Sequence, residues 1–240
     1  MPMQASATSG TVRVWDWPTR VFHWLLVFCL ISAWASHQFA PKLGDLTLKW
    51  HRWNGYAILV LLVFRLLWGL VGSSTSRFAN FVKGPIFTAH YALDFARGNK
   101  RPYLGHNPLG TVMILVLLAF VGVQATLGLF TLEHNEIVAG PLKRLIDDAT
   151  TEWVSKLHVK LFDYLLIAIG IHILANTAYG LIAKEPLIRA MITGRKPEHT
   201  YEDAPEAIID RGVSLRALYC FVAALVFVFG GITLAGGRIV

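Results

Sequence analysis

The chain has 240 residues, of which 55% are hydrophobic and only 15% are Asp, Glu, Lys or Arg. Soluble domains carry about 25% of these charged residues, so the composition excludes an ordinary soluble domain and is typical of a polytopic membrane protein. The formal net charge is +7. In a membrane protein such an excess is expected from lysine and arginine in cytoplasmic loops, so we do not expect a nucleic-acid partner.

Residues 1–12 are small and polar, and no cleavage pattern follows them. We therefore expect a disordered tail there and no signal peptide. The two cysteines, Cys29 and Cys220, both lie inside apolar runs, which predicts buried packing residues and rules out a CxxC metal or redox site. The chain has no CxxCH sequence, so covalent haem attachment of the c type is excluded.

Five apolar stretches are long enough to cross a bilayer as helices. The first follows an aromatic and basic segment that is typical of an interfacial anchor, in which Trp15 and Trp17 are the aromatic pair. Asp16 is expected to cap this helix, with Pro18 in its first turn. The expected spans are residues 19–37, 48–72, 108–130, 153–179 and 214–235.

With these five spans, the chain is expected to form an all-α, polytopic transmembrane helical bundle. Residues 13–182 are expected to form a four-helix core, and residues 214–240 an accessory fifth transmembrane helix. The segment 73–107 is polar and basic, with an amphipathic middle that is expected to lie along the membrane surface. Residues 183–213 are expected to form a charged cytoplasmic loop.

The distribution of lysine and arginine sets the expected orientation. With the N-terminus inside, thirteen of these residues fall in inner segments and seven in outer segments. Because cytoplasmic segments carry the excess of positive charge, this distribution favours a cytoplasmic N-terminus and a periplasmic C-terminus. We therefore expect a multi-pass protein of the bacterial inner membrane, surrounded by lipid.

Four histidines sort into two layers when the spans are followed in order. His158 and His172 are fourteen positions apart, so on one helix they share nearly the same face and are separated by about 21 Å along the axis. His51 lies near the outer end of the second span, and His23 near the inner end of the first. The topology therefore pairs His23 with His172 in an inner layer and His51 with His158 in an outer layer.

Ionisable residues inside membrane spans are costly and usually functional. Imidazole is a suitable axial ligand for haem iron, and two histidines fill both axial positions, which leaves electron transfer as the chemistry. We therefore predict two bis-histidine b-type haems stacked across the bilayer. A zinc site would gather its ligands at one depth and include carboxylate or thiolate. The histidines not expected to bind iron are His37, His90, His106, His134 and His199.

Haem propionates need cations near the membrane faces. Arg20 lies one turn before His23, Arg52 adjoins His51, and Arg65 lies at inner depth on the second span, so all three are candidates for propionate binding. For Arg65 a helix–helix salt bridge or snorkelling to the interface is the alternative. Two glycines, Gly55 and Gly170, either clear room for a porphyrin or serve ordinary helix packing.

At these residues the chain resembles the bacterial cytochrome b561 and nickel–iron hydrogenase b-type cytochrome family. The matching pieces are VWDWPTRVFHWLL, HRWNGYAILVLLVFRLLWGLVG, YLGHNPLG and the spacing of His158 and His172. The resemblance implies a four-helix diheme core with His23, His51, His158 and His172 as ligands. It also implies electron exchange between a quinone and a soluble or peripheral redox partner. The fifth span lies outside the minimal four-helix pattern.

The leading interpretation is a diheme membrane cytochrome of the respiratory chain, whose partner is a periplasmic c-type cytochrome or oxidoreductase subunit. A stand-alone, quinone-linked oxidase of a small oxidant such as superoxide is the first alternative. It would need a basic funnel on the outer face, for which the candidates are Lys42, Lys49, Arg52, Lys143, Arg144 and Lys156. A non-redox metal carrier or transporter is the second alternative, although inverted repeats and broken helices are not evident.

Overall fold

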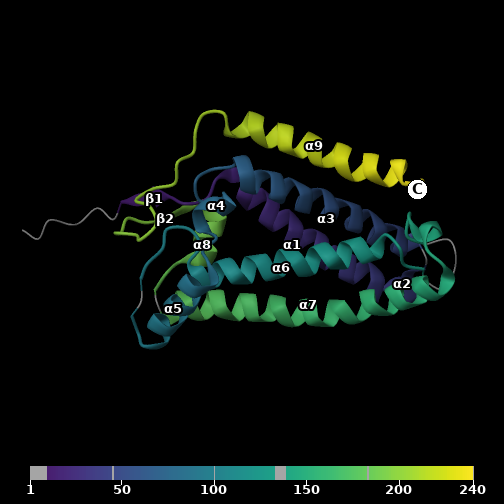
Figure 1. The fold of residues 1–240 in the computed structure, drawn as a ribbon, viewed down its shortest axis with the longest axis horizontal. Coiled ribbons are helices and arrows are strands. Elements are labelled where there is room, and N and C mark those ends of the chain that lie inside the picture. Colours follow the sequence, from purple (N-terminus) through teal and green to yellow (C-terminus); the bar gives the residue numbers. More distant parts are fainter. Residues whose placement is uncertain (1–9, 45, 100, 133–138, 183, 240) are drawn as a thin grey trace, which may run out of the picture.

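The computed structural model describes residues 10–44, 46–99, 101–132, 139–182 and 184–239. Within these ranges, five helices are long and apolar enough to cross a membrane. They run side by side along the long axis of the molecule (Figure 1). The prediction of an all-α membrane bundle with five spans is confirmed. These helices are α1 (Trp17–Gln38), α3 (Leu46–Val71), α6 (Pro108–Gly128), α7 (Asp148–Ile182) and α9 (Val213–Leu234).

The first and third spans begin at side-chain caps. Asp16 Oδ1 accepts a hydrogen bond from a backbone amide of the first turn of α1 at 2.7 Å, and Pro18 follows in that turn. Asn107 caps α6 in the same way, at 2.7 Å, with Pro108 as the next residue. The first amides of a helix have no partner within it, so a capping oxygen and an early proline both fit there. The expected cap and proline of the first span are confirmed.

Helix α3 lies at the centre of the bundle and contacts α1, α6 and α9, while α6 contacts α7. Half of the most apolar part of α3 is buried inside the protein, against 11% of that of α7. On the other spans large apolar side chains point outward; Phe28, Leu174 and Phe227 are all more than 60% exposed. An apolar exterior of this kind suits a bundle whose solvent is lipid.

The fifth span, α9, packs along α3 at the edge of the bundle. Its buried residues recur every three or four positions, which places them on one stripe of the helix. Cys220 belongs to this stripe, and Cys29 of α1 lies in the same core. Both cysteines are free and buried, as the sequence predicts. The buried residues of α9 are Ala217, Cys220, Ala224, Val228 and Ile232.

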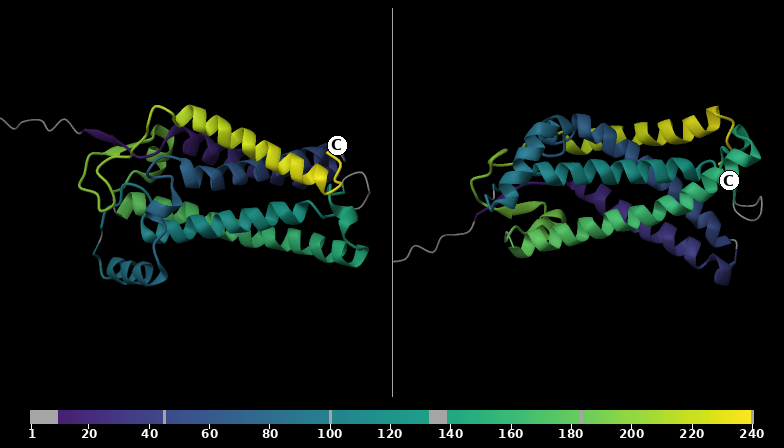
Figure 2. Two further views of the ribbon diagram at one scale, coloured as in Figure 1. Left: turned by 45° about the horizontal axis from the view of Figure 1, so that its top comes forward. Right: turned by 60° about the horizontal axis from the view of Figure 1, so that its bottom comes forward.

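The two ends of the bundle differ in their connections. One end, called the strand end here, carries two short strands and three short helices, and α5 projects from the bundle there (Figure 2). These elements are β1 (Thr11–Arg13), β2 (Arg195–Pro197), α4 (Phe78–Phe81), α5 (Pro85–Ala96) and α8 (Leu187–Thr193). The opposite end, called the far end, carries α2 (Ala40–Leu43) and the 3-10 helix η2 (Lys143–Leu145).

Two expectations of irregular structure need correction at the strand end. Strands β1 and β2 pair antiparallel, with Val12 opposite Lys196. The last residues of the expected tail are therefore ordered, and the expected loop 183–213 contains both α8 and β2. The reason is a small second core in which Val14, Trp15 and Leu104 are buried against α8. Residues 1–9 lie outside the described residues.

Asp16 joins this small core to the bundle. Its carboxylate is 1% exposed. It accepts hydrogen bonds from Trp68 Nε1 at 3.2 Å, from Ser76 Oγ at 2.8 Å and from Ser73 Oγ. A buried carboxylate is tolerated only when such donors replace water. One side chain thus fixes the start of α1 to the end of α3 and to the turn that follows α3.

Candidate functional site

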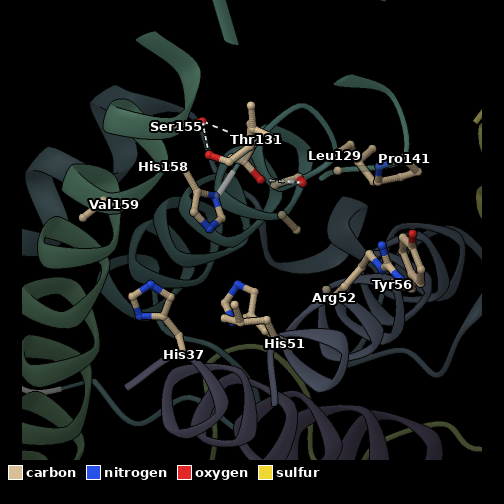
Figure 3. A pocket seen from close by; sticks show the side chains of 16 residues that line it. His37, His51, Arg52, Tyr56, Leu129, Thr131, Pro141, Ser155, His158 and Val159 are labelled. Carbon is tan, nitrogen blue, oxygen red and sulfur yellow. Dashed lines mark hydrogen bonds between the residues drawn. The ribbon is translucent and has the colours of Figure 1, made fainter. Parts of the chain in front are cut away.

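A pocket at the far end lies between α1, α3, α6 and α7. His51 of α3 and His158 of α7 face each other across it, and His37 from the last turn of α1 lies beside His51 (Figure 3). The ring centroids of His51 and His158 are 6.2 Å apart, and the ring planes are almost perpendicular, at 82°. The structure therefore brings together the two histidines that the sequence assigns to the outer layer.

Backbone carbonyls hold both of these rings. His51 Nδ1 lies 2.8 Å from the carbonyl oxygen of Ala33, and His158 Nδ1 lies 3.0 Å from that of Gln124. Because a carbonyl oxygen only accepts, each Nδ1 carries the hydrogen and donates it. The lone pair of each neutral imidazole is then on Nε2, which is the tautomer required of a metal ligand anchored through its other nitrogen.

The dimensions of the pocket fit an iron between the two imidazoles. Two metal–nitrogen bonds of about 2 Å, with about 1 Å from each nitrogen to its ring centre, add up to ~6 Å. This sum matches the measured 6.2 Å. Gly55 lines the pocket, and a Cβ there would meet nothing within 4 Å. The pocket is also lined by Leu48, Leu129 and Leu132, so the donor set and its surroundings suit a haem.

Three further residues of this pocket carry polar groups. Arg52 lines it and donates from Nη1 to the carbonyl oxygen of Ala139 at 3.4 Å. Tyr56 also lines it, and its hydroxyl is buried without a hydrogen-bond partner. The ring of His37 lies 5.8 Å from that of His51. The sequence signal for His37 is its position fourteen residues after His23, the same spacing that relates His158 to His172.

The other predicted pair lies at the strand end, where α1 begins and α7 ends (Figure 1). His23 and His172 are close enough for their charges to interact. His23 Nδ1 is buried and has no hydrogen-bond partner. The amide nitrogen of Asn176 lies 3.3 Å from His172 Nδ1 and donates to the carbonyl oxygen of His172 at 2.7 Å. This pair therefore shares one end of the bundle, but it lacks the carbonyl anchors of the far-end pair.

The two propionate candidates at the strand end, Arg20 and Arg65, both have partners within the protein. Arg20 donates to the carbonyl oxygen of Ile192 in α8. Arg65 is 3% exposed. Its guanidinium lies 4.7 Å from the centre of the Phe78 ring, and Nη1 donates to the carbonyl oxygen of Ser76 at 3.3 Å. Electrostatic attraction to Asp16 accompanies these contacts. Propionate binding by Arg20, Arg52 and Arg65 stays a prediction.

A histidine that the sequence leaves without a role lies close to this pair. The His106 ring is held between Trp15 and Phe81, at centroid distances of 4.5 and 4.7 Å. Burial, followed by the nearby charges of Arg65, Lys196 and His172, lowers its pKa to about 3. His106 is therefore a neutral imidazole at physiological pH. Its contacts with Trp15 and Phe81 are packing contacts, and its Nδ1 is buried without a hydrogen-bond partner among the described residues.

Comparison with known proteins gives one family match and one relative. A family described as prokaryotic cytochrome b561 matches residues 14–194, a range that includes all four predicted ligands. A protein from Bradyrhizobium diazoefficiens, named as a probable Ni/Fe-hydrogenase B-type cytochrome subunit, is 22% identical over 217 residues. The match covers 78% of this chain and 86% of the relative.

Proposed function

Because the chain belongs to the prokaryotic cytochrome b561 family, we propose that it is a diheme membrane cytochrome that passes electrons between a quinone and a periplasmic redox partner. Membership of the family supports b-type haem and electron transfer in a bacterial membrane. The proposal adds the number of haems, their bis-histidine ligation, the quinone and the partner. One haem would be held by His51 and His158 at the far end, and the other by His23 and His172 at the strand end.

The far-end pocket is the observation that carries the proposal. Two imidazoles face each other at a centroid separation of 6.2 Å. Backbone carbonyls accept hydrogen bonds from both through Nδ1, which leaves Nε2 of each ring for a metal. Ordinary packing of two helices does not require both rings to be anchored and aligned in this way. The second pair, at the opposite end of α1 and α7, supports a second haem at a different depth.

The chain's own groups define what such a site can do. If His51 and His158 both held one iron, the protein would supply both of its side-chain ligands, which would favour electron transfer over oxygen chemistry. A bound haem supplies reversible one-electron chemistry. The histidines hold the iron, the apolar side chains between the helices exclude water, and Arg52 offers positive charge at the rim of the far-end pocket.

The proposed direction across the membrane follows from the charge distribution. The strand end would face the cytoplasm, because the inner segments carry most of the lysine and arginine. The far end would then face the periplasm and a c-type cytochrome or oxidoreductase subunit. The relative named as a hydrogenase cytochrome subunit supports an oxidoreductase subunit as the partner. The quinone would be reduced or oxidised near the strand-end pair.

Haem content and redox titration of the purified chain, expressed with ample haem supply, test the proposal. We expect two haems per chain and two redox components. His158→Ala should remove one component and His172→Ala the other, with the remaining component retained in each variant. A colourless preparation, or a single haem in the wild type, would refute the diheme proposal. Loss of the same component in both variants would refute the two-layer arrangement.

The superoxide-oxidase alternative receives less support from the far-end surface. It needs free cations that guide an anion to the haem edge. Lys143 pairs with Asp148 at 2.9 Å and Lys156 with Glu152 at 2.6 Å. Arg144 donates to the carbonyl oxygen of Gly236. The two carboxylates lower the net positive charge of the expected funnel, and the bond to Gly236 holds the Arg144 guanidinium in place. We therefore place a periplasmic electron-transfer partner first.

A further inference from the structure

Gln124 is a strongly polar residue one turn before the end of the apolar helix α6, and the functions above do not use its side chain. It is 9% exposed, and it lies on the face of α6 that contacts α7. A buried amide in a membrane span is expensive unless its donors and acceptor are satisfied. Its presence therefore points to a specific task at the contact between α6 and α7.

The side chain and the backbone of Gln124 both bind the same residue of α7. Gln124 Nε2 donates to the carbonyl oxygen of His158 at 2.9 Å. In return, His158 Nδ1 donates to the carbonyl oxygen of Gln124 at 3.0 Å. Two hydrogen bonds that run in opposite directions fix the backbone position of His158 and the direction of its ring at the same time.

The surroundings show that this contact is made at a cost in stability. Gln124 Oε1 is buried and has no hydrogen-bond partner among the residues that the structure describes, so these residues satisfy only the amide nitrogen. A methionine of similar length would fill the space without that penalty. On the next turn of α6, a Cβ at Gly128 would lie 3.3 Å from His158 Cε1. The α6 surface thus combines a polar anchor with cleared space around one imidazole.

We propose that Gln124 is a positioning residue for the far-end haem. Its side chain holds the backbone of His158 in the position where the hydrogen bond from Nδ1 to the Gln124 carbonyl oxygen is short. This hydrogen bond in turn sets the orientation of the imidazole and the electron density on Nε2. This inference rests on the proposed function, because it assigns His158 as an axial ligand. A ligand imidazole that donates from Nδ1 is a stronger base toward the metal, so weakening that bond should raise the midpoint potential of the far-end haem.

The test variant is Gln124→Met, which keeps the length of the side chain and removes both its polar atoms. The redox component that His158→Ala removes should shift to a higher midpoint potential, and its low-spin ferric EPR signal should move. The component that His172→Ala removes should keep its potential and its signal. Thr126→Met on the same helix is the matched control, because Thr126 is exposed toward lipid and both components should stay unchanged.

A purely structural role for Gln124 would give a different result. If Gln124 only joined two helices, the Met variant would lower thermal stability while both haem signals stayed in place, and that outcome would overturn the proposal. Equal shifts of both components would also overturn it. If the Met variant binds no haem, Gln124→Asn, which keeps an amide but is one methylene too short to reach His158, is judged by the same criteria. A wild type without a His158-dependent component would overturn the proposed function as well.

Discussion

Gly128 gives a test of the far-end pocket at the level of one methyl group. A Cβ at this position would lie 3.3 Å from His158 Cε1 and 3.7 Å from Nδ1, so Gly128→Ala should push the ring by a few tenths of an ångström. We expect a lower occupancy or a shifted potential of the haem proposed for the far end, measured by redox titration of the purified variant. The strand-end component should be unaffected.

Gly122→Ala on the same helix is the control for this prediction. A Cβ at Gly122 would meet nothing within 4 Å, so this variant should only gain helix propensity, worth about 1 kcal/mol. The haem signals of Gly122→Ala should equal those of the wild type. Identical haem signals in the two alanine variants would contradict the close contact between α6 and the His158 ring.

The sequence predicts the histidine layers because depth follows from helix rise alone. Fourteen residues between His158 and His172 fix their separation whatever the helices pack against. The hydrogen-bond acceptors of the His51 and His158 rings could not be predicted in this way, because they are the backbone carbonyls of Ala33 and Gln124. A carbonyl is present at every residue, so its use as an anchor leaves no mark in the sequence. The sequence does show the spacing of His37 from His23, and the structure places His37 in the wall of the same pocket.

At the level of elements, the spans could be predicted because twenty or so apolar residues have few alternatives in a bilayer. The start of α7 is less clear in the sequence. The helix begins at Asp148, five residues before the expected start, where Asp147 accepts from the Thr150 backbone amide at 2.9 Å. The pairing of β1 with β2 could not be predicted, because it joins segments about 180 residues apart and depends on a core formed by several loops.

The buried ion pair next to these strands makes their stability testable. Lys196 Nζ lies 3.2 Å from Glu185 Oε2, and the lysine side chain is 2% exposed. Burial lowers the pKa of Lys196, and the Glu185 carboxylate opposes that shift. Lys196→Ala leaves Glu185 without its partner, so we expect a loss of about 3 kcal/mol in the stability of the strand end. This loss of stability is measured by thermal unfolding in detergent, with proteolysis at the strand end as the readout.

The control for this ion pair is Lys143→Ala at the far end. Its partner Asp148 has a side chain that is 92% exposed, and exposed pairs of this kind contribute less than about 1 kcal/mol. Replacing both members of the buried pair, as in Lys196→Met with Glu185→Gln, should recover most of the loss. A Lys196→Ala variant as stable as Lys143→Ala would contradict a structural role for the buried pair.

For the whole molecule, the two ends differ in architecture as well as in charge. The strand end is closed by a second small core around Val14 and Trp15, held to the bundle by Asp16. Among the described residues, the far end carries the short helices α2 and η2, and the His51–His158 pocket lies there. An electron-transfer partner would need close approach to this pocket. The proposed orientation places this end in the periplasm.

Cysteine labelling in spheroplasts tests that orientation. The native Cys29 and Cys220 are buried, so they should not react with a membrane-impermeant maleimide. Lys42→Cys places an exposed thiol at the far end, and Thr200→Cys places one at the strand end. In spheroplasts we expect labelling of Lys42→Cys at once and of Thr200→Cys only after the membrane is permeabilised. The reverse pattern would put the far-end pocket in the cytoplasm, and the periplasmic partner would have to be abandoned while the haem ligation could still hold.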